Sequence, residues 1–379
     1  MNTVNPGTIS AAQNLCTGDD PAALNVVTGA TGTGTTTYIW QQSANATGPW
    51  TSISGQTGTS YDPAVLGSTT YFSISATSVL NGVSCSLNTP AIAVNVYSLT
   101  PGSISSSQTI CTGGDPTTFT SIPATTNAPL VTYQWQMSTD NSSWTNITSA
   151  TSATYDPPAL TTTTYYRRLV NVLIGSTVIC QGQSNTITVT VVADPTVSAP
   201  TGQTICTGGT PAPLTVTASG GINSSYTYQW YNGATAIGGA TSSAYTPTSA
   251  AATYYCLVSI NPAATTGCSV SSGTAQITVV ADPVVSAPTG ASYCQDAASV
   301  SALSVTASGG LSSTYSYQWY VNTANNNTSG APISGATTSS FTPPVNVVGT
   351  KYYYCIVSID PSSTGCSTAS AVAAIAVTA

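Results

Sequence analysis

The chain contains no histidine and no glutamate, and its only basic residues are Arg167, Arg168 and Lys351. Histidine and glutamate are the usual general bases, and histidine is a common zinc ligand, so a Ser-His-Asp triad and a histidine-containing metal site are excluded. No glycine-rich phosphate loop follows a strand and opens a helix. The sequence therefore predicts a protein that is not an enzyme and binds no cofactor.

Positive charge is too scarce to attract anionic partners. The net charge is −7, and all ten acidic residues are aspartates. Binding to phosphate backbones or anionic lipid depends on clustered Lys and Arg, so nucleic acid is not an expected partner. No apolar run approaches the length of a membrane span, which argues against direct membrane insertion.

A secretory leader is also missing from the sequence. The chain opens at Met1 with Asn-Thr-Val-Asn-Pro, without a basic region or an apolar region behind it. Its ten cysteines recur at repeated positions, which is typical of an oxidising compartment. We expect a fragment of a larger secreted protein whose signal peptide and anchor lie outside this chain.

The chain does contain a sequence repeat of roughly 95 residues, which occurs four times. A repeat of constant length indicates an array of similar domains. Each copy carries an early cysteine, a Tyr-x-Trp segment, an aromatic pair and a late cysteine. The predicted repeats span residues 1–98, 99–193, 194–281 and 282–379. The Trp of each copy is expected to be a core residue: Trp40, Trp135, Trp230 and Trp319.

Apolar residues alternate with polar ones in several segments. Residues 132–137 (Thr-Tyr-Gln-Trp-Gln-Met) and 185–191 (Asn-Thr-Ile-Thr-Val-Thr-Val) follow the period of two that marks a half-buried strand. No stretch has a helical period with caps, and turn residues recur between the strand-length runs. The pattern predicts an all-β chain of four tandem immunoglobulin-like β-sandwich domains.

The connection between repeats has a constant length. From each late cysteine to the next early cysteine there are 26 residues: 85 to 111, 180 to 206 and 268 to 294. The connecting segment holds a last strand, a few Pro-containing residues and a first strand, without a Gly/Ser tether. A constant, slack-free connection predicts a constant geometry between domains, and hence an elongated, semi-rigid rod in which each repeat's partners are its neighbours.

Three disulfide patterns fit the eight structural cysteines, which are Cys16, Cys85, Cys111, Cys180, Cys206, Cys268, Cys294 and Cys366. In immunoglobulin-like topology the early cysteine lies at the end of its domain that abuts the next repeat, which favours bonds across the joints: Cys16–Cys180, Cys111–Cys268 and Cys206–Cys366. The simplest alternative joins the early and late cysteines of one repeat. A third pattern pairs Cys206 with Cys256 and Cys294 with Cys355.

Two further thiols, Cys256 and Cys355, follow tyrosine pairs in the third and fourth repeats. A cysteine in such a strand is typically a small buried hydrophobe. Aligned on the tyrosine pairs, the equivalent residues are Ser73 and Arg167, which predicts a face that is not fully buried.

The aspartates could bind calcium, and two of the tryptophans could bind a sugar. Seven of the ten aspartates directly precede proline, which is typical of turns, and Asp19–Asp20 is the single acidic pair, so calcium ligation is the weaker interpretation. Trp50 and Trp144 lie in turn-rich segments of the first two repeats, where an exposed indole can stack on a sugar ring. The alternative is that these indoles cover the edge of the sandwich.

The succession of Cys-Thr-Gly-Gly, Tyr-Gln-Trp, Thr-Tyr-Tyr and Thr-Val-Thr-Val resembles the immunoglobulin-like repeats of large Bacteroidota cell-surface adhesins of the SprB-type gliding class. The resemblance covers all four repeats and implies export to the bacterial cell surface, with a part in attachment or gliding. The favoured hypothesis is a stalk that projects an adhesive tip. The alternatives are a module that binds surface glycans through exposed aromatics and a subunit of a self-assembling extracellular filament.

Overall fold

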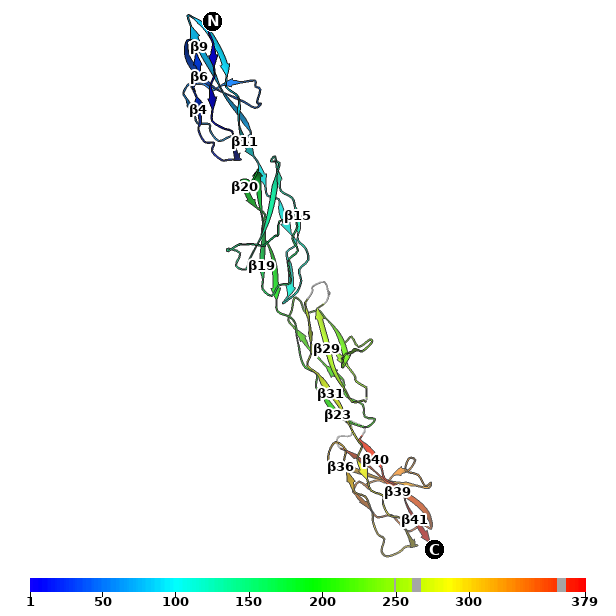
Figure 1. Cartoon of the computed structure of the whole chain (residues 1–379). Coiled ribbons are helices and arrows are strands. Elements are labelled where there is room, and N and C mark those ends of the chain that lie inside the picture. Colours follow the sequence, from blue (N-terminus) through cyan, green and yellow to red (C-terminus); the bar gives the residue numbers. More distant parts are fainter. Residues whose placement is uncertain (249, 261–266, 360–365) are drawn as a thin grey trace. The chain divides into compact units, whose positions relative to one another are not determined.

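The computed structural model describes residues 1–248, 250–260, 267–359 and 366–379. Asp360, one of the aspartates before proline, lies outside the described residues. These residues form strands joined by turns, and the described part of the chain has no helix able to span a bilayer. The chain divides into two compact units, Met1–Val192 and Ala193–Ala379, each containing two repeats (Figure 1).

The strands recur in the same order in each copy of the repeat, and the predicted repeat boundaries are kept here as names for the four copies. In the first repeat the strands are β1 (Val4–Asn5), β2 (Thr8–Ile9), β3 (Gln13–Cys16), β4 (Leu24–Thr28), β5 (Thr31–Gly32), β6 (Thr35–Ser43), β7 (Thr51–Ser52), β8 (Ser60–Tyr61), β9 (Thr70–Leu80), β10 (Val83–Asn88) and β11 (Ile92–Tyr97). In the second they are β12 (Leu99–Thr100), β13 (Ser103–Ser105), β14 (Gln108–Cys111), β15 (Thr120–Ile122), β16 (Thr125–Thr126), β17 (Val131–Ser138), β18 (Thr145–Asn146), β19 (Thr164–Ile174), β20 (Thr177–Gln183) and β21 (Ile187–Val192).

The second unit repeats this succession. Its third repeat contains β22 (Thr196–Val197), β23 (Gln203–Cys206), β24 (Leu214–Thr215), β25 (Ala218–Ser219), β26 (Tyr226–Asn232), β27 (Thr235–Ala236), β28 (Ala244–Tyr245), β29 (Ala252–Ile260), β30 (Ser269–Ser271) and β31 (Ala275–Val280). Its fourth contains β32 (Val284–Val285), β33 (Ala291–Cys294), β34 (Leu303–Ser304), β35 (Ala307–Ser308), β36 (Tyr315–Asn322), β37 (Ala331–Pro332), β38 (Ser340–Phe341), β39 (Gly349–Ile359), β40 (Ser367–Ala369) and β41 (Ala373–Thr378).

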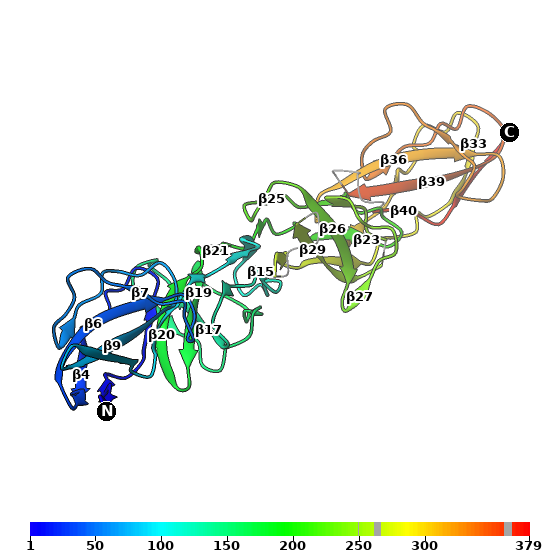
Figure 2. The same ribbon diagram turned by 90° about the horizontal axis from the view of Figure 1, so that it is seen from above.

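Each repeat has one large sheet with the same strand order. In the first repeat it runs β3-β11-β9-β6-β7, with β10 paired to the far half of β9. The early strand β3 runs parallel to the last strand β11, and the other pairs are antiparallel. Smaller pairings such as β2-β4-β8 supply the opposite layer. Figure 2 shows the equivalent long strands β36 and β39 side by side in the fourth repeat.

Alternation along the long strands builds the core. Along β19, side chains from Thr164 to Val172 are alternately buried and half-buried, as the period-two pattern requires when one face of a sheet is covered. The four repeat tryptophans lie on the inner face and have no exposed surface. The indole N–H of each donates to a backbone carbonyl 2.9–3.0 Å away, so the buried donor is satisfied.

The strand register corrects the sequence alignment of the buried thiols by one residue. Trp230 pairs with Cys256 and Trp319 with Cys355. The equivalent partners of Trp40 and Trp135 are Ile74 and Arg168, not Ser73 and Arg167. All four partners have no exposed surface, so the prediction of an incompletely buried face is wrong. A shift of one residue exchanges the two faces of a strand, which is why the tyrosine pairs misled the alignment.

Candidate functional site: the joint between repeats

The connection between the first two repeats contains a single residue outside strands. Strand β11 ends at Tyr97 and β12 begins at Leu99, with Ser98 between them. The last residue of β16 and the residue after it hold this segment by hydrogen bonds. The Asn127 side chain accepts from the Ser98 N–H at 2.9 Å and donates to the Val96 carbonyl at 3.1 Å. The Thr126 hydroxyl donates to the Ser98 carbonyl at 2.6 Å. The segment therefore has its polar backbone groups engaged by the second repeat.

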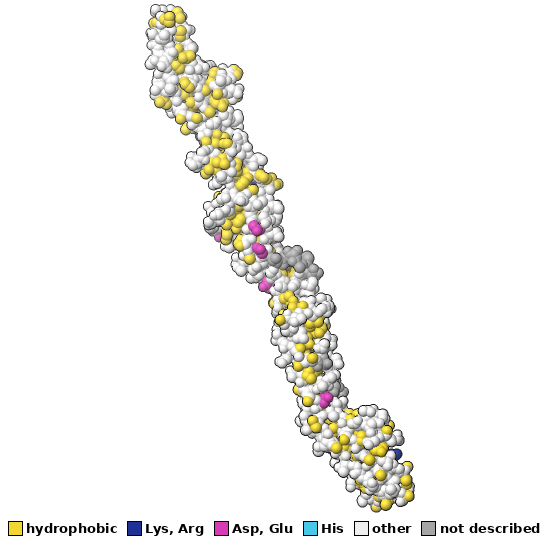
Figure 3. Space-filling model, turned by 45° about the vertical axis from the view of Figure 1, so that its right-hand side comes forward, with side chains coloured by type: hydrophobic (Ala, Val, Ile, Leu, Met, Phe, Trp, Pro, Cys, Tyr) yellow, Lys and Arg dark blue, Asp and Glu magenta, His cyan; other side chains and the backbone are white. Residues whose placement is uncertain are grey.

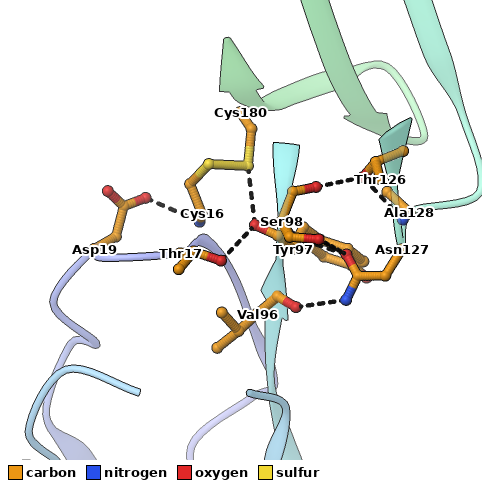
Figure 4. Close-up of a disulfide and its surroundings, with 10 residues drawn as sticks. All are labelled: Cys16, Thr17, Asp19, Val96, Tyr97, Ser98, Thr126, Asn127, Ala128 and Cys180. Carbon is orange, nitrogen blue, oxygen red and sulfur yellow. Dashed lines mark hydrogen bonds between the residues drawn. A yellow bond between two sulfur atoms is a disulfide. The ribbon is translucent and has the colours of Figure 1, made fainter. Parts of the chain in front are cut away.

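A disulfide bond also links the first repeat to the second at this joint. Cys16, at the end of β3, is bonded to Cys180 on β20, and their Cα atoms lie 5.3 Å apart (Figure 4). The Tyr97 carbonyl oxygen lies between them: it accepts from the Thr17 N–H at 2.9 Å and lies 3.5 Å from the Cys180 sulfur. The Asp19 carboxylate accepts from the Cys16 N–H at 2.9 Å and so holds the turn that carries the cysteine.

The joint inside the second unit has the same bond in apolar surroundings. Cys206, at the end of β23, is bonded to Cys366, with the Cα atoms 5.1 Å apart. Both sulfurs lie in a small cluster with Ile359, against which Val280, Leu311 and Tyr315 pack. The Thr207 N–H donates to the Val280 carbonyl at 3.0 Å, the same contact that Thr17 makes with Tyr97. The bond recurs, whereas the side chains around it change from amide and hydroxyl groups to aliphatic and aromatic ones.

The observed bonds discriminate among the three pairing patterns. Cys16 and Cys206 each bond to the late cysteine of the following repeat, and not to that of their own. Cys256 and Cys355 are unpaired, so the pattern that joins them to Cys206 and Cys294 is not present. Cys111 and Cys268 are also disulfide-bonded, and the pairing of one with the other stays a prediction.

Four thiols are unpaired, and they fall into two kinds. Cys256 and Cys355 are completely buried, and burial raises the pKa of both, that of Cys355 to about 11. Cys85 is half-buried and Cys294 is exposed. The first pair therefore belongs to the cores, as predicted, and the second pair lies where other molecules can reach it.

Trp50 and Trp144 are both half-buried. One face of the Trp144 ring is covered by the Arg167 guanidinium, whose carbon lies 4.2 Å from the ring centre. Arg167 in turn donates to the Gln136 side chain at 2.7 Å. A sugar could stack only on the other face of this indole, so the structure favours the role of edge cover for Trp144.

The sequence did not single out a pair of stacked tyrosines on the outer face of the large sheet. In the third repeat, Tyr231 on β26 and Tyr255 on β29 have ring centres 4.9 Å apart and planes 4° from parallel. The equivalent pair in the fourth repeat is Tyr320 and Tyr354, 5.1 Å apart. The sequence pattern that could have identified them is a tyrosine next to the core tryptophan and another next to the core cysteine. In a strand, neighbouring side chains point to opposite faces, so these tyrosines face away from the core.

Charged and metal-binding chemistry is sparse among the described residues. Figure 3 shows one face, on which hydrophobic side chains are interspersed with polar ones and charged ones are rare. The described ranges contain no group of three His, Cys, Asp or Glu side chains placed to hold a metal ion. Asp140 accepts from the backbone N–H groups of Ser143 and Ser142, and these bonds hold its pKa well below the ordinary value.

Comparison with known proteins found one family model that matches the first two repeats, and solved structures that are only distantly similar. Residues 5–98 and 100–193 each match a family model described as a domain of unknown function (DUF8696). None of the curated proteins compared with the chain matches it. Among solved structures, titin domains I67–I69 are similar at 16% identity over 72% of this chain and 96% of that one, with a TM-score of 0.33.

Two further structures are similar to a comparable degree. The three N-terminal domains of the bacteriophage RB49 outer capsid protein Hoc match at 17% identity, covering 73% of this chain and 99% of that one, with a TM-score of 0.36. Sidekick-1 immunoglobulin domains 1–5 match at 12% identity, covering 100% of this chain and 78% of that one, with a TM-score of 0.25. Likenesses this distant carry no argument about function.

The strand order within each repeat establishes the fold class. The large sheet places the last strand beside the long strand that is third from the end of the repeat, with an early strand parallel to the last, and a smaller layer packs opposite. This is the arrangement of an immunoglobulin-like sandwich. The protein is built of four such sandwiches in tandem. Because disulfide bonds persist in oxidising surroundings, those at the joints indicate an extracellular protein.

Proposed function

We propose that this protein is a structural stalk segment of a bacterial surface adhesin, in which four sandwiches, with boundaries as predicted from the sequence, hold an adhesive tip away from the cell. The observation that carries the proposal is the joint. Between the first two repeats, a single residue lies outside strands, the Asn127 side chain is hydrogen-bonded to that residue, and a disulfide bond spans the joint, so these two repeats have little freedom to move relative to each other. A stalk that holds a tip at a distance from the cell needs stiff joints between its repeats.

The composition suits such a role outside the cell. Charged residues make up 3% of the chain, and with three basic residues it offers few sites to trypsin-type proteases. The resemblance to Bacteroidota adhesin repeats supports placement on the bacterial surface and a part in attachment or gliding. Repeat arrays in which each unit contacts only its neighbours are extendable by duplication, which fits a stalk.

Solution scattering of the oxidised full chain tests the proposal. We expect an elongated monomer whose maximum dimension does not change with concentration, and which becomes more variable in shape after reduction of the joints. The chain with Cys85→Ser is a matched control, because Cys85 is unpaired and its loss leaves the joints intact. A compact particle under oxidising conditions would refute the stalk.

A glycan-binding module is the second candidate, and the stacked tyrosines of the third repeat favour it. None of the strands of that sheet carries a charged residue, and Thr253 and its pair partner Gln276 are exposed on the same face. Aromatic rings, amides and hydroxyls without charge suit a neutral sugar. Binding on a glycan array that Tyr231→Ala abolishes would support this function. Tyr320→Ala is the matched control, because its partner Tyr354 is buried and accepts from the Gly330 N–H.

A further inference from the structure

A hollow of about 590 Å³ lies over β6 and β9 in the large sheet of the first repeat. Ile39 and Ser75 line it and are paired across the two strands. Each stands beside a residue without exposed surface, Trp40 and Ile74, so both side chains point away from the core. Pockets that bind small ligands commonly measure about 300–1,000 Å³, so the hollow has the size of a ligand site.

The pair that lines the hollow differs from its counterparts in the other repeats. In those repeats the residue before the core tryptophan is a glutamine, and its partner on the neighbouring strand is leucine or isoleucine. The three pairs are Gln134–Leu169, Gln229–Leu257 and Gln318–Ile356. Serine has a much smaller side chain than leucine, and isoleucine has a shorter one than glutamine. The pair Ile39–Ser75 therefore leaves a space that the other three pairs occupy.

The glutamine of the other repeats also covers the edge of its strand. The Gln134 side-chain amide donates to the Trp135 carbonyl at 2.9 Å and to the Ile147 carbonyl at 2.8 Å. The equivalent glutamines of the third and fourth repeats make the same two bonds. Ile39 has no donor, so the Trp40 carbonyl lacks this side-chain partner. The first repeat is therefore the one in which this part of the sheet has no amide lying across it.

Three hydroxyl groups at the hollow have no partner within the described part of the protein. Thr37, Thr57 and Ser75 line it, and their side-chain oxygens make no hydrogen bond to any described residue. The hydroxyl of Thr77, which is also in the lining, is bonded to that of Ser86 at 2.7 Å. A hydroxyl can both donate and accept, so the three unpaired groups can bind the hydroxyls of a ligand.

The hollow has no charge to offer a ligand. Neither β6 nor β9 contains a charged residue, and residues 53–59, which carry Thr57, contain none. We propose that this hollow is a binding site for a neutral carbohydrate of one or two sugar units. The three hydroxyls hydrogen-bond the hydroxyls of the sugar, and Ile39 contacts the C–H groups of its ring. The site shares no residue with the stacked tyrosines of the third repeat, and it does not depend on the stalk role.

The test gives the first repeat the pair that the second has. Ile39→Gln with Ser75→Leu in the full chain should fill the hollow, and it should fold, because the second and third repeats contain the same pair. An array of neutral mono- and disaccharides identifies a sugar that the unaltered chain binds, and titration calorimetry with that sugar compares the two proteins. We expect the double variant to bind the sugar at least about tenfold more weakly.

Two further variants show where the sugar binds. Ser75→Ala removes one of the three hydroxyls and adds no atoms, so weaker binding in this variant cannot come from steric damage to the fold. We expect its affinity to fall by at least about twofold. Tyr231→Ala is the control for the third repeat, and it should leave the affinity unchanged.

Four results would overturn the proposal. The first is an array on which the unaltered chain binds no neutral sugar, and the second is undiminished binding by both the double variant and Ser75→Ala. The third is loss of binding in Tyr231→Ala, which would assign the sugar to the third repeat. The fourth is self-association without sugar binding that the double variant abolishes, which would assign the hollow to a contact between copies. Scattering tests the stalk separately, because none of these substitutions alters a joint.

Discussion

Arg168 lies directly opposite Trp135 across the β17–β19 pair, in the core position that is aliphatic or a thiol in the other repeats. Its guanidinium has no exposed surface and lies over the Tyr133 ring, 4.2 Å from the ring centre. It donates to the Ala153 carbonyl at 2.7 Å and to the Ile122 carbonyl at 3.0 Å. A buried cation is thus held by backbone oxygens and an aromatic face.

Arg168→Ala should destabilise the second repeat by at least about 3 kcal/mol, because it removes the hydrogen bonds to the Ala153 and Ile122 carbonyls and leaves a cavity beside Trp135. Arg168→Met keeps most of the volume and removes the charge, so it should cost at least about 1 kcal/mol less. Calorimetry of the full chain measures both changes. Equal losses for the two variants would show that the hydrogen bonds, and not the packing, dominate.

Removal of the joint disulfide by Cys16→Ser with Cys180→Ser should lower the free energy of unfolding of the first unit. The bond links residues 164 apart, and a loop of that size restricts the unfolded chain by on the order of 5 kcal/mol. Denaturant titration under oxidising conditions measures the loss. Cys85→Ser is the matched control and should leave the midpoint unchanged, because that thiol is unpaired.

Two thiols should react quickly and two slowly in the folded chain. Cys85 and Cys294 are accessible, whereas burial protects Cys256 and Cys355 and raises the pKa of both, that of Cys355 to about 11. Iodoacetamide at mildly alkaline pH followed by mass spectrometry should label the first pair alone until denaturant is added. Rapid labelling of Cys355 in the native chain would contradict its place in the core.

The raised pKa of Cys355 also makes the stability of the fold depend on pH, with the free energy of unfolding falling as pH rises. Folding favours its neutral thiol, so this contribution is fully present below the ordinary value of 9.0 and is lost as pH rises from there through about 11. Cys355→Ala should weaken the dependence of the unfolding midpoint on pH in that window. A midpoint with the same dependence on pH in Cys355→Ala as in the unaltered chain would contradict this contribution of the buried thiol.

Asp140 should make the loop before Trp144 sensitive to acid. Its pKa is lowered, so its contribution is present above the ordinary value of 3.8 and is lost as pH falls below that value through the folded-state pKa. The fluorescence difference between the chain and its Trp144→Phe variant, followed from pH 5 downward, should report the change. Asp140→Asn should abolish that dependence, and a fluorescence change that persists in this variant would assign it to another group.

The fold could be predicted from the sequence to a large extent, because its signals are local. Alternation along residues 132–137 and 185–191 was enough to infer strands, and β17 and β21 cover most of both segments. The alignment of Cys256 and Cys355 failed because tyrosines on both faces of β29 and β39 look equivalent in the sequence. Only the pairing with Trp230 and Trp319 shows which tyrosine faces inward.

By itself, the sequence determined the fourfold repeat, the all-β character and the buried tryptophans, since a fixed period and an apolar alternation are properties of neighbouring residues. It left open which cysteines are bonded, because partners such as Cys206 and Cys366 are 160 residues apart and in different repeats. The tertiary structure decided that question by bringing the end of one sandwich against the beginning of the next. Proximity of two sulfurs is a property of the fold, and no spacing along the chain specifies it.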